Sequence, residues 1–170
     1  MKIYYQTYQT KLGQGGVAWR EDGVVYLSIL PGFPTPPPKN YLEKKSTHAF
    51  VKHLRNYFNQ GTPIPNNIPL DWSRLPELHQ LVLQECRKIR IGKTITYAEL
   101  AKRVGKPDAT RAIGQILRKN PFAPFVPCHR VIGTRSIGGF GGNGHVELKR
   151  HMLELEKGMA NRQIGLSPQA

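Results

Sequence analysis

A cysteine and a histidine stand side by side in the segment PCHRV (127–131). A free thiol has a pKa of about 8.5, so only a small fraction of it is a nucleophilic thiolate at neutral pH. A neighbouring imidazole can accept the thiol proton, and a carboxylate behind the imidazole would hold its tautomer and stabilise its charged form. The pair Cys128 and His129 therefore predicts nucleophilic chemistry at the sulfur.

The backbone around this pair decides whether the two side chains can act together. Neighbouring side chains point to opposite faces of a regular strand, so Cys128 and His129 can cooperate only if the chain bends or a water bridges them. Pro124 and Pro127 favour an irregular path. Upstream, Asn120 precedes a proline, which disfavours the helical conformation, and its side chain can bond nearby backbone groups and fix the turn. A simple helix stop is the alternative role for Asn120.

A helix predicted over about residues 144–157 offers a candidate acid and base. By spacing, one face of it carries Lys149, Met152, Leu153 and Glu156. Charged groups on a side that also carries apolar residues suggest an inward-facing pair, and Glu156 is then the candidate carboxylate behind the imidazole. A solvated helix end and an ordinary surface lysine remain the alternatives for Glu156 and Lys149.

A glycine-rich loop, IGTRSIGGFGGNG (132–144), lies between the cysteine and this helix. Its glycines follow neither the P-loop nor the Rossmann spacing, which excludes those kinds of nucleotide-phosphate site. Phe140 could instead form a wall that stacks on a flat heterocycle. The alternative is a long surface loop.

A pair of short helices is predicted before the cysteine. Thr96 and Glu99 form a capping box that starts the first helix, and Gly105 stops it. The second helix, from about Thr110 to Lys119, has an apolar face of Ala109, Ala112, Ile113, Ile116 and Leu117. Its opposite face carries Arg111, Gly114, Gln115 and Arg118. Glycine inside a helix costs about 1 kcal/mol relative to alanine, so Gly114 suggests that another surface approaches the backbone there. The pair has the proportions of a helix-turn-helix, although many such pairs bind nothing.

The composition favours a polyanionic partner. The 170 residues include 25 Lys and Arg against 11 Asp and Glu, a formal net charge of +14, and the excess is spread along the chain. Nucleic acid is the simplest such partner, and a solvated basic surface is the alternative. Cys86 and Cys128 make neither a disulfide framework nor a zinc site. Because no apolar run resembles a signal peptide or a membrane span, we expect a soluble intracellular protein, cytoplasmic or associated with the nucleus or nucleoid.

The predicted fold class is α+β. Alternation rich in Tyr and Val over residues 1–9 and 16–30 predicts antiparallel strands, and helical spacing predicts a helix from Tyr41 to about Gln60. A proline-rich connection over 61–72 sets a boundary between an N-terminal domain, 1–72, and a C-terminal domain, 73–170. In the second domain, a helix ending near Gly92 carries an apolar stripe of Leu78, Val82, Cys86 and Ile89. This stripe makes Cys86 a core residue.

Several segments together resemble a known family. They are TYAELA (96–101), RAIGQILRKNP (111–121), VPCHRVIG (126–133), IGGF (137–140) and K…LELEKG (149–158). In this order they are similar to the O6-alkylguanine-DNA alkyltransferases, also called methylated-DNA–protein-cysteine methyltransferases. The resemblance covers about residues 74–158. It implies a strand-rich N-terminal domain and a mostly helical, winged-helix-like C-terminal domain whose helix-turn-helix enters the minor groove of duplex DNA.

The resemblance also implies the roles of the candidate catalytic residues. Cys128 would attack the alkyl carbon on O6 of a flipped-out guanine, and His129 would take the thiol proton through a water. Glu156 would orient the imidazole, Lys149 would lie near the thiolate, and Asn120 would hold the turn that carries the cysteine.

Further roles concern DNA and the guanine. Tyr97 would turn the nucleotide through its 3′ phosphate and later give a proton to the departing guanine, and Arg111 would fill the space that the nucleotide leaves. Gly114 would permit close docking on a DNA-binding face that also includes Gln115 and Arg118. The base pocket would be lined by Val131, Phe140 and Gly141, with the Gly141 N–H in place of a hydroxyl contact common in the family.

The resemblance therefore predicts a DNA repair enzyme that acts once, as a stoichiometric alkyl acceptor with no cofactor and no metal. Its partner would be double-stranded DNA containing O6-alkylguanine, with no membrane contact, and we expect a monomer. Two other functions are compatible with parts of the sequence. A Cys-His-Glu hydrolase would use the same side chains on an acyl substrate, and a DNA-binding module would use the helix pair with no chemistry.

Overall fold

The centre of the N-terminal sheet is a long hairpin. β1 (Ile3–Thr10) runs antiparallel to β2 (Gly13–Arg20), and β3 (Val25–Ile29) lies antiparallel on the other side of β2. β4 (Tyr41–Glu43) pairs with β1 in parallel, so the strand order is β3-β2-β1-β4. The structure is a computed structural model that describes residues 1–33, 39–44, 48–139 and 145–165.

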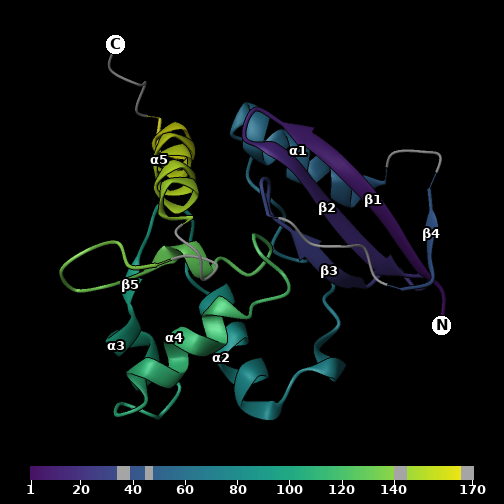
Figure 1. The fold of residues 1–170 in the computed structure, drawn as a ribbon. Helices are drawn as coiled ribbons and strands as arrows, with labels where there is room; N and C mark the ends of the chain where they lie inside the picture. The colour runs from purple at the N-terminus through teal and green to yellow at the C-terminus, as the bar shows by residue number, and fades with distance from the viewer. Residues whose placement is uncertain (34–38, 45–47, 140–144, 166–170) are drawn as a thin grey trace. The chain divides into compact units, whose positions relative to one another are not determined.

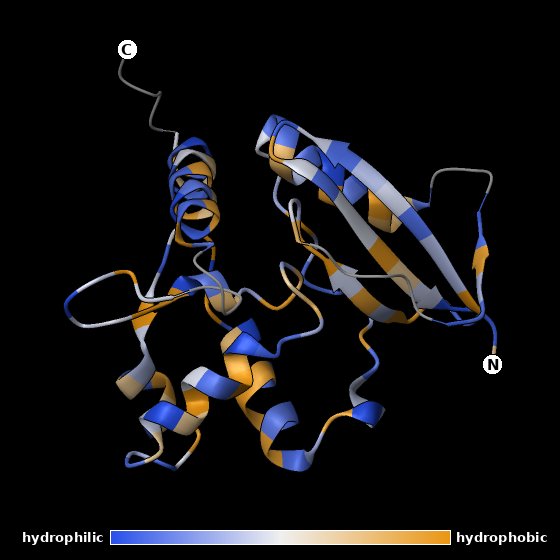
Figure 2. Ribbon diagram, viewed as in Figure 1, coloured by the Kyte–Doolittle hydropathy of each residue, from blue (hydrophilic) through white to orange (hydrophobic). Residues whose placement is uncertain are grey.

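α1 (Ala49–Gln60) packs on one face of this sheet (Figure 1). Strand alternation places Tyr8 and Trp19 on that face, where their rings meet those of Phe58 and Phe50 at centroid distances of 6.3 and 6.1 Å. The opposite face of α1 is polar. Figure 2 shows the resulting alternation of hydrophobic and hydrophilic residues along strands and helix.

The predicted start of this helix at Tyr41 is wrong. Residues 41–43 form β4, where the Tyr41 ring meets that of Tyr5 edge-on at 5.1 Å. α1 begins at Ala49 because His48 caps it, with Nδ1 accepting a hydrogen bond from the Phe50 N–H at 3.3 Å. A short apolar run fits a strand as well as a helix, so periodicity alone did not separate them.

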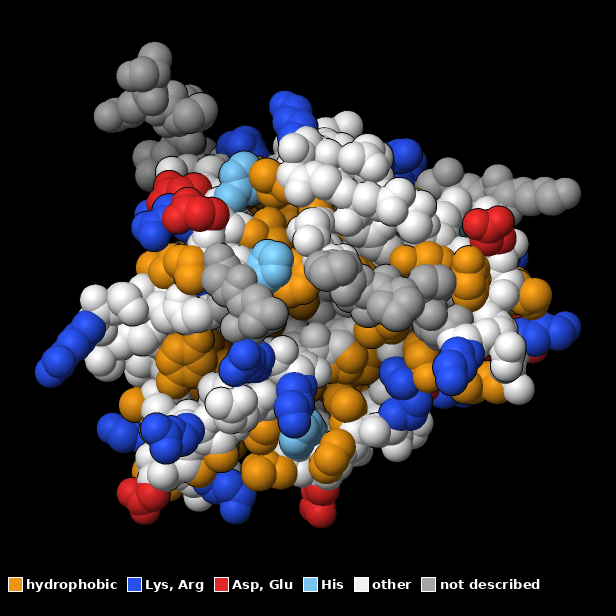
Figure 3. Space-filling view, viewed as in Figure 1, with side chains coloured by type: hydrophobic (Ala, Val, Ile, Leu, Met, Phe, Trp, Pro, Cys, Tyr) orange, Lys and Arg blue, Asp and Glu red, His pale blue; other side chains and the backbone are white. Residues whose placement is uncertain are grey.

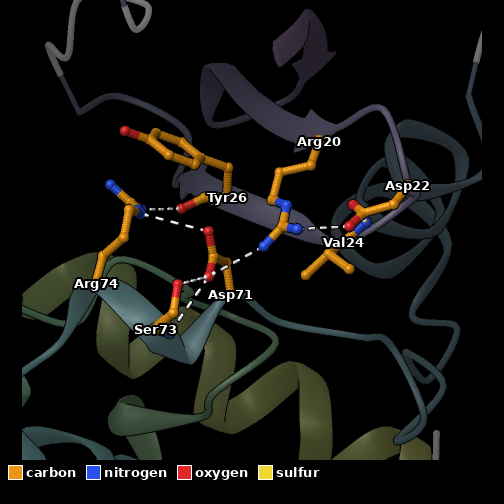
Figure 4. A network of polar contacts seen from close by, with 7 residues as sticks. All are labelled: Arg20, Asp22, Val24, Tyr26, Asp71, Ser73 and Arg74. Atoms are coloured by element: carbon orange, nitrogen blue, oxygen red, sulfur yellow. Dashed lines mark hydrogen bonds and ion pairs between the residues drawn. The ribbon is translucent and has the colours of Figure 1, made fainter. Parts of the chain in front are cut away.

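The buried carboxylate of Asp71 links the segment after α1 to the N-terminal sheet (Figure 4). Asp71 is 4% exposed and lies 3.5 Å from Arg20 and 3.7 Å from Arg74, and the Ser73 hydroxyl donates to it at 2.6 Å. Arg74 also donates to the Tyr26 carbonyl at 2.6 Å and stacks over that ring. Burial would raise the pKa of Asp71, but Ser73 and the two arginines hold it below its ordinary value. The carboxylate is therefore charged and paired.

The chain divides into two compact units. The first comprises Met1–Arg74 and Pro121–Phe125, and the second comprises Leu75–Asn120 and Val126–Ala170. The segment Pro121–Phe125 groups with the first unit, although it lies inside the predicted C-terminal domain of residues 73–170. Within the first unit, the Ser28 N–H donates to the Pro121 carbonyl at 2.8 Å.

The second unit is mostly helical. In chain order it contains α2 (Glu77–Arg87), β5 (Ile95–Thr96), α3 (Tyr97–Arg103), α4 (Thr110–Arg118), the 3₁₀ turn η2 (Cys128–Arg130), β6 (Val131–Ile132) and α5 (Val146–Gln163). The two short strands pair in parallel, Ile95 with Val131 and Thr96 with Ile132. The α+β fold class predicted from the sequence is therefore confirmed.

The predicted start of α3 matches its cap. The Thr96 hydroxyl accepts a hydrogen bond from the Glu99 N–H at 3.1 Å. Cys86 is fully buried on α2, as its apolar stripe predicts. Ala112, however, is exposed and does not belong to the apolar face of α4. Successive residues are about 100° apart around a helix, and Ile113, Ile116 and Leu117 fill the buried side.

α5 extends beyond its predicted end at Lys157, because Met159 continues its buried face. No helix in the described part of the chain is long and apolar enough to cross a bilayer.

Candidate active site

Cys128 and His129 lie on a tight turn. The turn η2 has the Cys128 N–H bonded to the Val126 carbonyl and the Arg130 N–H bonded to the Pro127 carbonyl, both at 2.9 Å. The irregular path that the prolines favour is therefore present. The cysteine is 7% exposed and the histidine is fully buried.

α5 brings a carboxylate to the histidine. Glu156 Oε1 lies 2.7 Å from His129 Nε2, and both side chains are buried. Burial would raise the pKa of Glu156, but the facing His129 and Arg130 lower it well below its ordinary value. Burial lowers the pKa of His129, and the opposing effect of Glu156 does not fully restore it. A neutral imidazole that donates from Nε2 to Glu156 presents Nδ1 as its proton acceptor.

Arg130, which is mostly buried, completes this group, and its role was not predicted from the sequence. Its Nε donates to Glu156 Oε2 at 2.8 Å and its Nη2 to Oε1 at 2.9 Å, while Nη1 donates to the Ile89 carbonyl at 2.5 Å. This two-pronged contact fixes the plane of the carboxylate that the imidazole faces. A signal was available in the sequence, because an inward-facing glutamate requires a cationic partner and Arg130 follows the histidine directly.

Lys149 is fully buried on the same face of α5 as Glu156. Its Nζ donates to the Val131 carbonyl at 2.7 Å, the Gly139 carbonyl at 3.2 Å and the Tyr97 hydroxyl at 3.4 Å. Burial lowers the pKa of Lys149 to about 8, against an opposing effect of Cys128. The ammonium is therefore a cation near the thiol that is still mainly charged at neutral pH.

Tyr97 opens α3 and lies between glycines of two other segments. A Cβ at Gly138 would lie 3.1 Å from the Tyr97 ring and hydroxyl, and one at Gly114 would lie 3.9 Å from the ring. Gly138 also has a positive φ of +76°. Gly114, predicted to allow a close approach, thus meets Tyr97 at an ordinary contact distance. Burial raises the pKa of Tyr97, and the neighbouring Cys128 and Cys86 raise it further.

The environment of the thiol favours its protonated form. Burial raises the pKa of Cys128, while a hydrogen bond from Asn120, the charge of Lys149 and nearby backbone N–H groups lower it only in part. Asn120 also donates to the Val126 carbonyl at 2.9 Å, which ties the end of α4 to the cysteine turn. A protonated thiol needs a base when it reacts, and His129 is the adjacent residue that can provide one.

The outer face of α4 is polar and cationic. Arg111, Gln115 and Arg118 are exposed, and Gly114 is half-buried. Lys and Arg side chains are spread over the visible surface, with few acidic ones among them (Figure 3). This distribution agrees with the formal net charge of +14.

The protein-family model "6-O-methylguanine DNA methyltransferase, DNA binding domain" matches residues 77–158. A methylated-DNA–protein-cysteine methyltransferase of Haemophilus influenzae is 33% identical over 162 residues, which cover 91% of this chain and 87% of the relative. The chain belongs to the methylated-DNA–protein-cysteine methyltransferase family.

Solved structures extend this relationship to the first unit. The crystal structure of the Mycobacterium tuberculosis O6-methylguanine methyltransferase is 29% identical, with a TM-score of 0.80 over 99% of this chain and 96% of that one. The M. tuberculosis OGT in complex with DNA is 30% identical, with a TM-score of 0.79 over 91% of this chain and 92% of that one. The family resemblance drawn from the sequence motifs is confirmed.

Most of the site residues predicted from the sequence lie in the second unit. Direct contacts link His129 to Glu156, and Lys149 to both Tyr97 and the backbone of Val131. Val131 is fully buried on β6. Phe140 and Gly141, predicted for the base pocket, lie outside the described residues. Among the residues that are described, no cluster of His, Cys, Asp or Glu could hold a metal ion.

Proposed function

We propose that this protein repairs O6-alkylguanine in duplex DNA by moving the alkyl group to Cys128, once per protein molecule. One observation carries this proposal. The buried thiol of Cys128 directly precedes His129, whose Nε2 faces the charged carboxylate of Glu156, and Arg130 donates hydrogen bonds to that carboxylate. Family membership supplies the substrate class, since the matched model and relatives are named for methylated DNA.

The reaction is a displacement at carbon. The Cys128 thiol gives its proton to His129 Nδ1 through a water, and Glu156 stabilises the imidazolium that results. The sulfur forms a bond to the alkyl carbon as the bond from that carbon to O6 breaks, and the electron pair leaves with guanine. Cys128 ends as a thioether, which has no proton to lose and no route back to a thiol, so the protein acts stoichiometrically and without a cofactor.

Tyr97 and Lys149 act on the leaving group. The departing guanine carries the negative charge released from the broken bond, and a proton from the Tyr97 hydroxyl neutralises it. Because the Lys149 ammonium donates toward the oxygen of Tyr97 at 3.4 Å, it directs the tyrosine hydrogen elsewhere and stabilises the oxygen after proton transfer. The same cation stabilises the thiolate before attack.

DNA binding is assigned to the helix pair. α4 enters the minor groove with Arg111, Gln115 and Arg118 toward the DNA, and Arg111 occupies the space of the flipped nucleotide. Flipping costs a few kcal/mol and costs least for a poorly paired base, which favours entry of lesions. We also propose that the protein works in the cytoplasm or at the nucleoid or nucleus, where a free catalytic thiol stays reduced.

The decisive test mixes purified protein with an oligonucleotide duplex containing a single O6-methylguanine. Peptide mapping by mass spectrometry should find a methyl group on Cys128, at a limit of one per protein molecule, and the DNA should contain guanine. Repeated turnover, or DNA that keeps its methyl group while Cys128 remains unmodified, would refute the proposal.

Arg111→Ala should slow transfer from duplex DNA by about tenfold to a hundredfold, corresponding to the few kcal/mol that flipping requires. Transfer from free O6-benzylguanine should stay unchanged, because a free base needs no flipping. Single-turnover rates on the two substrates provide the measurement. Lys2→Ala, which removes one positive charge from an exposed lysine just before β1, serves as the control for this comparison of rates. Equal losses on both substrates would contradict a flipping role for Arg111.

Gly138→Ala should destabilise the fold and also displace Tyr97. The positive φ costs a non-glycine residue roughly 1–2 kcal/mol, and the new Cβ would lie 3.1 Å from the tyrosine. Gly105→Ala is the matched control, because its φ is +73° and its added Cβ meets nothing within 4 Å. Chemical denaturation should give both variants a similar strain cost, with only Gly138→Ala slowing transfer. A wild-type transfer rate in Gly138→Ala would contradict the view that transfer depends on the position of Tyr97.

A further inference from the structure

The first unit is poor in acidic side chains. This unit has only four acidic residues in its sequence, Glu21, Asp22, Glu43 and Asp71. None of them belongs to α1, which instead carries Lys52 and Arg55, both exposed. A helix with no acid at its positive N-terminal end lacks an ordinary stabilising feature.

Three of the four acids pair with cations that do not belong to α1. Glu21 lies 3.5 Å from Lys2, and Asp22 lies 2.6 Å from Arg20, at the turn that follows β2. Since β1 and β2 are antiparallel strands of eight residues, this turn is about 25 Å from the opposite turn at Lys11. Asp71 is buried and paired, as described above.

The fourth acid lies on the other side of the sheet. Glu43 pairs in register with Tyr5, so the two side chains share a face, and the Tyr5 ring contacts Tyr41 there. α1 packs on the opposite face, against Tyr8 and Trp19. The acidic side chains of this unit therefore lie at the turn after β2, in the buried Asp71 cluster or on the face opposite α1.

Lys11 is tied to the C-terminal end of α1. Its backbone N–H donates to Asn59 Oδ1 at 3.4 Å, and Asn59 Nδ2 donates to the Gln9 carbonyl at 3.4 Å. Lys52, Arg55 and Asn59 stand at i, i+3 and i+7, which places them on one side of the helix. The ion pairs described within this unit involve other cations, namely Lys2, Arg20 and Arg74.

We propose that Lys11, Lys52 and Arg55 form a second DNA-binding surface, the α1 face, which contacts backbone phosphates and not the lesion. The inference rests on the proposed function insofar as alkyl transfer brings the protein to duplex DNA. Cations interspersed with amide side chains are the groups that bind phosphates without reading sequence. A lipid surface is a poorer fit, because membrane-surface helices expose large apolar residues. The large exposed hydrophobic residues of the described chain, Met1, Leu42, Leu81 and Ile164, all lie outside α1.

The salt dependence of DNA affinity tests this surface. Each phosphate contact contributes about 0.9 to the slope of log affinity against log salt concentration on duplex DNA. Lys52→Ala and Arg55→Ala should each reduce that slope by about 0.9 on an undamaged duplex of several helical turns. Lys2→Ala is the control, since it removes an equal charge from an exposed lysine at the acidic end of the sheet.

The outcomes separate this surface from the transfer site. Unchanged slopes for Lys52→Ala and Arg55→Ala, or an equal reduction for Lys2→Ala, would overturn the inference. If these two variants keep their slopes but lose binding to vesicles of anionic lipid, the α1 face binds membranes and the inference is wrong. Transfer from free O6-benzylguanine is measured on the same proteins. If the wild type fails to modify Cys128 there, the proposed function fails, whatever the slopes show.

Discussion

Cys128→Ala should abolish alkyl transfer while binding to lesion-containing DNA remains close to that of the wild type. The sulfur is the atom that forms the new bond to carbon, so its removal eliminates the product and does not merely slow the reaction. The side chain is 7% exposed and small, whereas the predicted DNA contacts lie on the exposed face of α4. Peptide mapping measures transfer, and fluorescence anisotropy with a labelled duplex measures binding.

Cys86→Ala is the matched control for this loss. Cys86 is fully buried on α2, and burial raises the pKa of its thiol well above the ordinary value. The variant should still accept one alkyl group on Cys128 and should lose about 1 kcal/mol of stability, as core truncations of this size do. An alkyl group found on Cys86, or transfer that persists in Cys128→Ala, would show that Cys128 is not the acceptor.

Local signals were enough wherever neighbouring residues decide the conformation. Thr96 and Glu99 predicted a helix start that the hydrogen bond between them confirms. The prolines around Cys128 predicted a departure from regular strand geometry, and a 3₁₀ turn is found there. Cys86 was assigned to the core from an apolar stripe of period 3.6, and it is fully buried.

Contacts between distant segments were harder to predict. Arg130 and Glu156 are 26 residues apart, and nothing in either local sequence gives the direction from which the guanidinium approaches. The approach of Gly138 to Tyr97 likewise depends on how a loop closes over the start of α3. β4 was missed because three residues pair in parallel with a strand more than 30 positions earlier. Tertiary pairing decides such short segments, and their own periodicity does not.

Glu156→Gln should combine a large loss of stability with a large loss of activity. Removing the buried charge leaves the mostly buried Arg130 guanidinium without its carboxylate, for which the expected cost is about 3 kcal/mol, the lower end of the range for a fully buried pair. The imidazole also loses the partner that fixes its tautomer and stabilises its charged form, so transfer should slow by about 10²–10⁴-fold. Urea denaturation and single-turnover transfer measure the two effects. Glu154→Gln is the control on the same helix, because Glu154 is exposed and pairs only with Lys157 among the described residues.

The same carboxyl should make wild-type stability sensitive to acid. The pKa of Glu156 is lower in the folded protein than its ordinary value of 4.5, because His129 and Arg130 outweigh the raising effect of burial. Such a group stabilises the fold fully above pH 4.5, and its contribution is lost as the pH falls below that value toward the folded pKa. Glu156→Gln has no such carboxyl, so its free energy of unfolding should fall less steeply with acidification than that of the wild type or of Glu154→Gln. Parallel acid profiles for all three proteins would mean that folding does not lower the pKa of Glu156. A wild-type transfer rate in Glu156→Gln would mean that the glutamate is not needed to position and charge the imidazole.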